Sequence, residues 1–281
     1  MEKHFVSPVF EEIWRDRYRK NDETYEENLR RVAHAVAQAE PENKRHIYEE
    51  SFFELLCSGD FFPGGRTMSN AGIGEKLTLN NCFVSPIIDD SMEGIFDAVK
   101  LGAVTHKSGG GIGYCFSNLA PNGRKTHNDA IASGPVSFMD VFNAQTRTVQ
   151  QGSRRGANMG VMSVYHPDIF EFLNAKATDP ERLNHFNLSV MVDDEFMAAV
   201  ETDDYITLHW PIYDEYGNHL SEELWDPQFT WNIKANDIWD VIMQKAYDNG
   251  EPGVFFEDTL RTWNPAYYVE NIVCSNPSMA A

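Results

Sequence analysis

The strongest constraint on the fold is a regular alternation of strand-like and helix-like segments after about residue 80. Apolar, β-branched or aromatic runs occur at 82–86 and 186–192, and segments with helical periodicity begin near residues 91, 137, 168 and 193 and span 233–249. Parallel strands need long crossovers, usually helices, so this alternation predicts an α/β fold with a mostly parallel sheet. We expect 253–256 to be a buried strand and 203–227 to hold short strands and turns.

The first 60 residues have a different pattern. Residues 9–57 are helical in periodicity, with Leu29, Val32, Ala33 and Val36 at the spacing of one helix face. Thr24 and Glu27 are spaced as a capping box at the start of that helix. A Phe-Phe-Pro-Gly-Gly break follows at 61–65. We therefore expect an N-terminal helical segment at 1–60 and a body at 61–281.

Two helices of the body carry apolar faces. Met92, Ile95, Phe96 and Val99 share one face of the first, and Asp90 is its predicted N-cap, with Glu93 three residues on. Phe138, Val141 and Phe142 share one face of the second. We expect both helices to pack through these faces.

Charge and cysteine content exclude several classes of protein. The 281 residues include 43 acidic and 23 basic ones, a formal charge of −20, which disfavours general binding to nucleic acids or anionic membranes. The start lacks a basic segment followed by an apolar one, and no window approaches ~18 apolar residues, so a cytoplasmic location is expected. Cys57, Cys82, Cys115 and Cys274 form no C-x-x-C pair, so no structural metal is expected and the cysteines should be thiols.

Two glycine-containing loops allow a functional and a structural interpretation. Residues 108–113 read Ser-Gly-Gly-Gly-Ile-Gly and could cradle a phosphate, or could form a tight turn into a packed strand. No Gly-Lys-Ser/Thr follows, which favours the turn. Residues 150–158 place Arg154 and Arg155 between two glycines, and could bind phosphate or a base edge, or form a solvated turn.

Two single residues have simple structural interpretations. Cys82, alone in a strand, would on base rates be a small core residue. His166, before Pro167 and Asp168, is most simply the entry to a helix rather than a ligand.

Several strings in fixed order resemble one enzyme family. From about residue 60 to 277 the chain resembles the catalytic subunit of ribonucleotide reductase, class II, the adenosylcobalamin-dependent type. The strings are Asn-Cys-Phe-Val at 81–84, Asp-Ser-Met-Glu-Gly-Ile-Phe at 90–96, His-Lys-Ser-Gly-Gly-Gly at 106–111, Ala-Ser-Gly-Pro-Val-Ser-Phe at 132–138, Arg-Arg-Gly-Ala-Asn-Met at 154–159 and His-Pro-Asp-Ile at 166–169.

The resemblance implies a fold and an incomplete catalytic centre. The family uses a ten-stranded α/β barrel built from two five-stranded parallel halves around a finger loop, so this chain would supply the helical layer and the first half-barrel, and the C-terminal half would be its partner. Cys82 matches one of two reducing thiols, whose partner would lie beyond residue 281. Asn276 matches a ribose-binding asparagine. Ser278 stands where the family has its radical cysteine, and Ala280 where it has its catalytic glutamate.

The resemblance also implies two nucleotide sites. Arg66, Thr67, Ser69 and Asn81, with Gln151 and Arg155 from the second specificity loop at 151–158, match positions that contact the ribonucleotide substrate. Asp90, Lys107, Arg124 and Lys125 are the candidates for binding a deoxynucleoside triphosphate effector, with the first specificity loop at 120–130. One departure is that 117–121 reads Ser-Asn-Leu-Ala-Pro where members often have Ser-Arg-Leu-Arg-Pro, so Arg124 and Lys125 would have to replace two cations.

The resemblance implies a thiyl-radical reduction of ribonucleotides, which needs a radical sulfur, a carboxylate base and two thiols. Since Ser278 and Ala280 lack two of these groups, the chain alone is expected to be inactive, and to form a homodimer without an N-terminal ATP-binding cone. The stop near Asn276 resembles an intein insertion point or a deliberate cut.

Two alternatives stay open: a fragment of a class I subunit that needs a separate metal-bearing radical subunit, or a non-catalytic nucleotide-binding or intein-precursor (extein) protein.

Overall fold

A computed structural model describes residues 7–279 apart from 75–76, 126–128, 150–155, 178 and 180. The chain divides into two compact units, Met1–Asn81 and Cys82–Ala281, which are described separately. The first unit continues past residue 60, where the sequence placed the end of the helical segment; that boundary stays a prediction.

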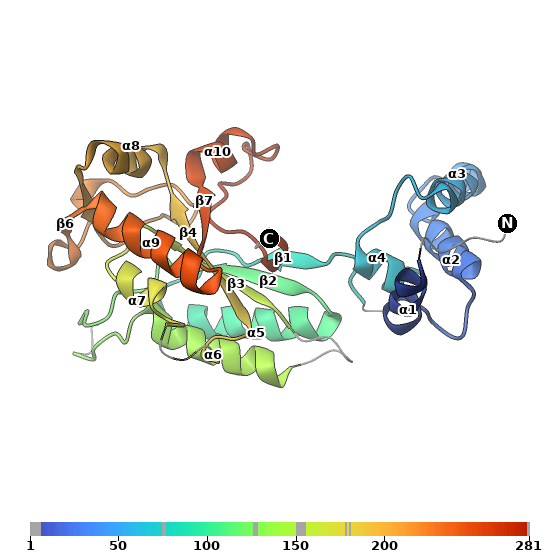
Figure 1. The fold of residues 1–281 in the computed structure, drawn as a ribbon, viewed down its shortest axis with the longest axis horizontal. Coiled ribbons are helices and arrows are strands. Elements are labelled where there is room, and N and C mark those ends of the chain that lie inside the picture. Colours follow the sequence, from blue (N-terminus) through green and yellow to red (C-terminus); the bar gives the residue numbers. More distant parts are fainter. Residues whose placement is uncertain are drawn as a thin grey trace. The chain divides into compact units, whose positions relative to one another are not determined.

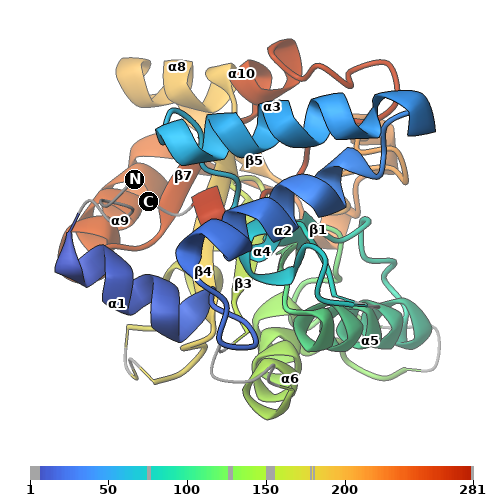
Figure 2. The same cartoon turned by 90° about the vertical axis from the view of Figure 1, so that its right-hand side faces the viewer.

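The Met1–Asn81 unit is helical. Its α2 begins with the predicted capping box, in which the Thr24 hydroxyl accepts from the Glu27 N–H (3.2 Å) and the Glu27 carboxylate accepts from the Thr24 N–H (2.7 Å). Leu29, Val32 and Ala33 are buried as predicted, whereas Val36 is 37% exposed. Figures 1 and 2 show α2 and α3 running side by side. The elements are α1 (Pro8–Arg17), α2 (Tyr25–Ala37), η1 (Glu42–Lys44), α3 (Arg45–Ser58) and α4 (Gly65–Asn70).

The Cys82–Ala281 unit is built on a five-stranded sheet in the order β1-β2-β3-β4-β7, and every pairing in it is parallel. Cys82 pairs in register with Gly111, and Ile112 with Asn158. The predicted α/β class and the five-stranded parallel half-barrel are therefore confirmed (Figure 1). The strands are β1 (Cys82–Val84), β2 (Gly111–Cys115), β3 (Asn158–Ser163), β4 (Phe186–Val192) and β7 (Gly253–Phe256).

Helices supply the crossovers between these strands, and α5 and α6 lie side by side in both views (Figures 1 and 2). A separate antiparallel pair joins β5 to β6 within the region predicted to hold short strands and turns. The remaining elements are α5 (Met92–Ser108), α6 (Pro135–Thr148), α7 (Ile169–Leu173), α8 (Asp194–Thr202), β5 (Tyr205–Leu208), η2 (Glu222–Leu224), η3 (Pro227–Phe229), β6 (Trp231–Lys234), α9 (Ala235–Asn249), α10 (Glu257–Thr262) and η4 (Pro277–Met279).

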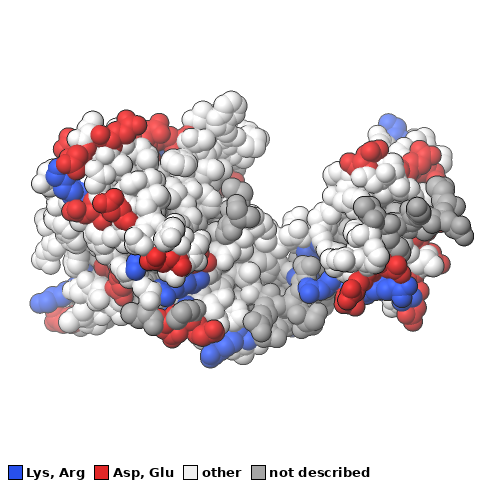
Figure 3. Space-filling model, viewed as in Figure 1, with Lys and Arg blue, Asp and Glu red and all other residues white. Residues whose placement is uncertain are grey.

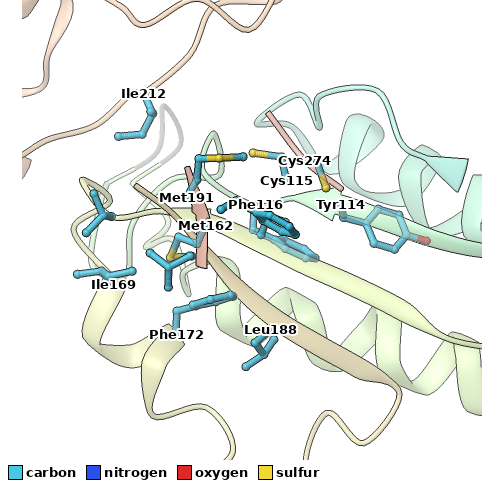
Figure 4. Close-up of a cluster of buried hydrophobic side chains, with 14 of the residues drawn as sticks. Tyr114, Cys115, Phe116, Met162, Ile169, Phe172, Leu188, Met191, Ile212 and Cys274 are labelled. Carbon is cyan, nitrogen blue, oxygen red and sulfur yellow. The ribbon is translucent and has the colours of Figure 1, made fainter. Parts of the chain in front are cut away.

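The core of this unit lies on both faces of the sheet. Tyr114 and Phe116, in and just after β2, pack edge-on against Phe142 of α6, with ring centroids 4.7 and 5.4 Å away. Cys274, far along the chain, belongs to the same buried cluster as Cys115 (Figure 4). The C-terminal segment is therefore part of the packed body.

Three details differ from the sequence-based predictions. The N-cap of α5 is Ser91, whose hydroxyl accepts from the Gly94 N–H, because the Asp90 carboxylate accepts instead from the Ala120 N–H (2.8 Å). Met92 and Phe96 are about half exposed while Ile95 is buried, so the predicted face of α5 is split. The strand at 253–256 forms at an edge of the sheet, where only Phe255 is buried.

The surface of the described residues is rich in carboxylates. On the face drawn in Figure 3 they gather over the region of α8, whose first turn contains Asp194 and Glu195. Among the described residues no helix has the length and apolar character needed to cross a membrane.

Candidate active site

The segment at 273–278 passes along strand β2. A Cβ on Gly113 would overlap the carbonyl oxygen of Ser275, and a Cβ on Gly111 would lie 3.3 Å from Pro277 Cγ. Gly111 and Gly113 share one face of the strand because side chains alternate along it. The tight turn into a packed strand is thus present: Gly109 ends α5 in the left-handed conformation (φ 94°), and the two glycines of β2 let the segment approach.

This path brings Cys82 and Ser278 together. Cys82 begins β1 and pairs with Gly111, and its Sγ lies 2.9 Å from Ser278 Oγ, a hydrogen bond in which either atom can be the donor. The Asn276 side chain accepts from the Ser278 N–H (2.9 Å) and so shapes the turn that presents the hydroxyl. Cys82, Asn276 and Ser278 therefore converge, as the resemblance implied; Ala280 lies outside the described residues.

Asn187 of β4 also reaches this segment, since its Nδ2 donates to Pro277 O at 3.5 Å. Nothing in the sequence around Asn187 indicates this contact, because Pro277 is 90 positions away.

Cys115 and Cys274, the other two cysteines of this unit, are poor sources of a reactive thiolate. Burial raises the pKa of Cys115 to about 11 and that of Cys274 well above its usual value, and the four cysteines are all free. Both thiols stay protonated at neutral pH and behave as core groups. In the part of the chain that the structure describes, no group of three or more His, Cys, Asp or Glu side chains is arranged to hold a metal ion.

A buried polar cluster lies at the amino end of β3, which follows the candidate second specificity loop in the sequence. Asn158 donates to the Thr146 hydroxyl (2.8 Å), and Gln145 contacts His106 Nδ1 (3.2 Å). Burial is the main cause that lowers the pKa of His106, so the ring is neutral at pH 7. A Cβ on Gly156 would lie 2.8 Å from Thr146 Cγ2 and 3.0 Å from the His106 ring. Gln151 and Arg155 lie outside the described residues.

The loop at 120–130, the candidate first specificity loop, starts near the carboxyl ends of the strands. We call its first residues, 120–122, the loop base. The Asp90 carboxylate accepts from the Ala120 N–H, and Asp168 Oδ2 accepts from the Asn122 N–H (2.8 Å). Desolvation raises the pKa of Asp90, and burial raises that of Asp168 to about 6. These two carboxylates hold both flanks of the same short turn.

His166 supports the same turn from below. Its Nδ1 accepts from the Asp168 N–H, so its Nε2 carries the proton and donates to Leu119 O (3.0 Å). Burial lowers the pKa of His166 to about 4, which keeps it neutral. The residue is a buried structural donor that lies just before α7.

The four candidate effector residues do not all gather in one chain. Arg124 lies near Asp90, donates to Asp226 Oδ2 (3.3 Å) and stacks 4.3 Å from the Trp210 ring. Lys125 is exposed in the same loop. Lys107 is at the other end of the 17-residue α5, about 25 Å from Asp90 at 1.5 Å per residue. Lys107 and Asp90 therefore lie at opposite ends of α5.

The candidate substrate-binding residues of the Met1–Asn81 unit form hydrogen bonds within that unit. The Arg66 N–H donates to Asn81 Oδ1 (2.9 Å), and the Thr67 hydroxyl donates to Leu79 O (3.0 Å). Ser69 is buried and donates to Asn70 Oδ1 (2.9 Å). Arg31 of α2 donates to the Ala71 and Met68 carbonyls behind them. Sequence patterns did not single out Arg31, because its contacts lie about 40 residues away.

The two units match two families that occur together. Residues 80–279 match the ribonucleotide reductase barrel domain, and residues 7–76 match the ribonucleotide reductase all-alpha domain. The five-stranded parallel sheet of the Cys82–Ala281 unit is consistent with part of such a barrel. The chain belongs to the ribonucleotide reductase large-subunit family.

Similar proteins fall into two groups. The chain is 38% identical over 277 residues to the vitamin B12-dependent ribonucleoside-diphosphate reductase of Thermoplasma acidophilum and 36% identical to that of Mycobacterium tuberculosis, with 97% and 94% of this chain covered. It is 28% identical to the ribonucleoside-diphosphate reductase large subunit of Monkeypox virus, with 80% covered. The chain spans 34%, 38% and 31% of these three proteins, about a third of each.

Proposed function

We propose that this chain supplies the helical layer and the first half-barrel of an enzyme that reduces ribonucleotides to deoxyribonucleotides by thiyl-radical chemistry, and that it is inactive alone. The observation that carries the proposal is the 2.9 Å approach of Ser278 to Cys82. Position 278, where the family pattern has the radical cysteine, lies beside Cys82, for which we propose the role of a reducing thiol.

The groups at this point suit binding better than radical chemistry. An O–H bond is much stronger than an S–H bond, so the Ser278 hydroxyl is a poor hydrogen donor to any radical, and it retains only the ability to donate and accept hydrogen bonds. Adenosylcobalamin, the proposed cofactor of the whole enzyme, would supply the radical. Position 278 holds no sulfur to receive that radical. Cys82 keeps the capacity to give electrons as half of a disulfide with a thiol from the C-terminal half.

The effector part of the proposal rests on the loop base. Asp90 and Arg124 lie at one end of α5 and Lys107 at the other, so a deoxynucleoside triphosphate would bind between two chains. The outer face of α5 offers a suitable apolar stripe, with Met92 54%, Phe96 48% and Val104 61% exposed. Helix pairing through this stripe would bring the Lys107 end of one chain to the Asp90 end of the other. We therefore propose a homodimer.

Thermal unfolding with each deoxynucleoside triphosphate tests the effector site. A ligand that binds only the folded chain adds about 2.7 kcal/mol at a hundredfold excess over Kd. Asp90→Ala should reduce the shift, and Arg124→Ala should reduce it further if Arg124 replaces the missing cations. Each variant needs its own baseline without ligand, since Asp90 also holds Ala120. An unchanged melting temperature with all four nucleotides at millimolar concentration would remove the effector site from the proposal.

Light scattering at tens of micromolar tests the association. The expected particle is a dimer, and Phe96→Glu on the exposed stripe should dissociate it, whereas Tyr247→Glu, at an exposed aromatic position of α9, should not. A monodisperse monomer of the unsubstituted chain contradicts the dimer.

Two alternatives keep specific tests. A class I fragment would need a separate metal-bearing radical subunit; the higher identity to the two vitamin B12-dependent proteins favours class II. A non-catalytic nucleotide-binding or intein-precursor protein is favoured by Ser278 and Ala280. The coding sequence downstream separates these possibilities, since it shows whether a second half-barrel, an intein or neither follows.

A further inference from the structure

A short hairpin at 213–219 lies against the chain that leads into the active-site segment. Tyr213 pairs with His219, and the Asp214 carboxylate accepts from the N–H groups of Tyr216 and Asn218, both at 2.8 Å. Gly217 completes the turn with a φ of 78°. These bonds define the hairpin locally, as an Asx-type turn with a glycine in the left-handed region.

The hairpin is anchored to the strand side of the unit by Asn118. The Asn118 side chain donates to Tyr213 O (3.0 Å) and accepts from the Tyr213 N–H (3.1 Å). The backbone carbonyl of Asn118 accepts from Trp210 Nε1 (3.1 Å). Asn118 is one of the two positions where family members often have arginine. Here its amide reproduces the pairing of a backbone peptide.

A buried carboxylate anchors the other side. Glu257, at the start of α10, is 2% exposed and accepts from the Tyr213 hydroxyl (3.1 Å). It also contacts His219 Nε2 (3.1 Å) and pairs with Arg261 (2.5 Å). Arg261 then donates to Gly217 O (2.6 Å) at the tip of the hairpin. Burial and the Glu257 charge raise the pKa of Tyr213 well above its ordinary value, so the phenol remains a donor.

The anchored hairpin holds residues 271–273. Asn271 Nδ2 donates to Tyr216 O (3.2 Å) and to Asn218 Oδ1 (2.8 Å). A Cβ on Gly217 would lie 2.9 Å from Val273 Cγ1, so the tip of the hairpin and the buried Val273 are in close contact. Residues 269–275 also border a cavity of about 620 Å³, which Glu215 and Tyr216 of the hairpin line as well. The hairpin therefore contacts the segment at 271–273, and β2 contacts it at 275–277.

We propose that the 213–219 hairpin is a clamp for the active-site segment, and that Asn271, Asn218, Arg261 and Glu257 are positioning residues that set the distance between position 278 and Cys82. Only four residues separate Val273 from position 278, so a shift at the clamp is carried directly to Ser278. The inference deepens the proposed function, because it takes 276–278 as part of the active site.

A disulfide between Cys82 and a thiol introduced by Ser278→Cys measures this distance. The background is Ser278→Cys with Cys57→Ser, which removes the exposed cysteine. Glutathione disulfide oxidises the two thiols, so that one protein disulfide forms and two glutathione molecules are released. Peptide mass spectrometry after alkylation gives the disulfide fraction at set ratios of oxidised to reduced glutathione, and from it the effective concentration of the two thiols. The background should form this disulfide because the parent atoms are 2.9 Å apart.

Asn271→Ala should lower that effective concentration about tenfold, since two hydrogen bonds to the clamp are lost. Asn236→Ala is the matched control: this partly buried asparagine also makes two bonds through Nδ2, to Val200 O (3.2 Å) and Asp203 Oδ1 (3.0 Å), but lies on α9. It should leave the effective concentration within twofold of the background. Asn218→Ala should lower the effective concentration less, because Asn271 keeps its bond to Tyr216 O, and the double variant should be no worse than Asn271→Ala alone.

The outcomes distinguish a failure of the clamp proposal from a failure of the active-site proposal. Equal disulfide formation in Asn271→Ala and Asn236→Ala, at equal melting temperatures, overturns the clamp and leaves the site intact. Failure of the background to form the Cys82 disulfide overturns the site geometry, the carrying observation of the proposed function, and the clamp with it. If Asn271→Ala does not fold, Arg261→Gln gives the same decision, since glutamine lacks the Nη2 atom that contacts both Glu257 and Gly217 O. An undiminished disulfide in Arg261→Gln counts against the clamp.

Discussion

The two ends of the parallel sheet position their residues in different ways. At the amino ends, Cys82 and Ser278 are set by shape: glycines in β2 let the 273–278 segment approach the strand, and the clamp holds its far end. At the carboxyl ends, the loop base is held by charge, through Asp90 and Asp168 on backbone N–H groups and Arg124 on Asp226. Substitutions that add volume should therefore damage the first end, whereas removing or titrating a carboxylate should change the stability of the second.

The largest expected effect concerns chemistry at the amino ends. The chain with adenosylcobalamin, dithiol and ribonucleotide should show no turnover above background, because the Ser278 hydroxyl cannot take the place of a radical sulfur. Ser278→Cys should not restore activity, since the second half-barrel and the partner thiol would still be missing. Deoxynucleotide formation is measured by chromatography. Turnover by either chain would mean that the shape of this end is sufficient for catalysis.

A larger side chain in β2 is the next test of the amino ends of the sheet. Gly113→Ala should destabilise the Cys82–Ala281 unit by about 3 kcal/mol, because the new methyl group overlaps the Ser275 carbonyl, which is backbone and cannot rotate away. It should also abolish the disulfide formed in the Ser278→Cys background. Gly253→Ala is the control within the sheet: its nearest neighbour is the Ser189 hydroxyl at 3.0 Å, a side-chain atom. Urea unfolding of both variants gives the comparison, and equal losses would contradict it.

The charge of Asp168 provides a test of the carboxyl ends of the sheet. The folded-state pKa of Asp168 is raised from 3.8 to about 6, so its contribution to stability is fully present below pH 3.8 and is lost as the pH rises through 6. Asp168→Asn keeps an oxygen for the Asn122 N–H without a charge. It should equal the wild type at pH 4 and exceed it by about 2 kcal/mol at pH 7. Urea titrations across this range should show a flatter pH profile for the variant; parallel profiles would exclude Asp168 as the cause.

The sequence predicted what depends on local pattern. The alternation of strands and helices, the Thr24 capping box and the turn at 108–111 follow from residues close together in the chain, and all three are confirmed. The convergence of Cys82 and Ser278 came from the family resemblance, because they are 196 positions apart and no periodicity links them.

What the sequence missed depends on distant contacts. Asn187 reaches Pro277 over 90 residues, and Asn118 holds Tyr213 over 95. The exposure of β7 was missed because a strand of apolar residues looks the same at an edge as in the middle of a sheet. The wrong N-cap has a similar cause: Asp90 and Ser91 are both good caps, and only the distant Ala120 N–H decides which one is free to cap α5.

The smallest expected effect separates those two neighbours. Ser91→Ala removes the cap of α5 and should cost about 1 kcal/mol of stability without changing the response to a deoxynucleoside triphosphate. Asp90→Ala should cost a similar amount, because the Ala120 N–H loses its acceptor, but should also reduce the nucleotide-dependent rise in melting temperature. Both variants are measured with and without nucleotide against their own baselines. If Ser91→Ala reduced the nucleotide response as much as Asp90→Ala, the response would depend on the integrity of α5 rather than on the Asp90 carboxylate, and the carboxyl ends would not be organised by charge at this position.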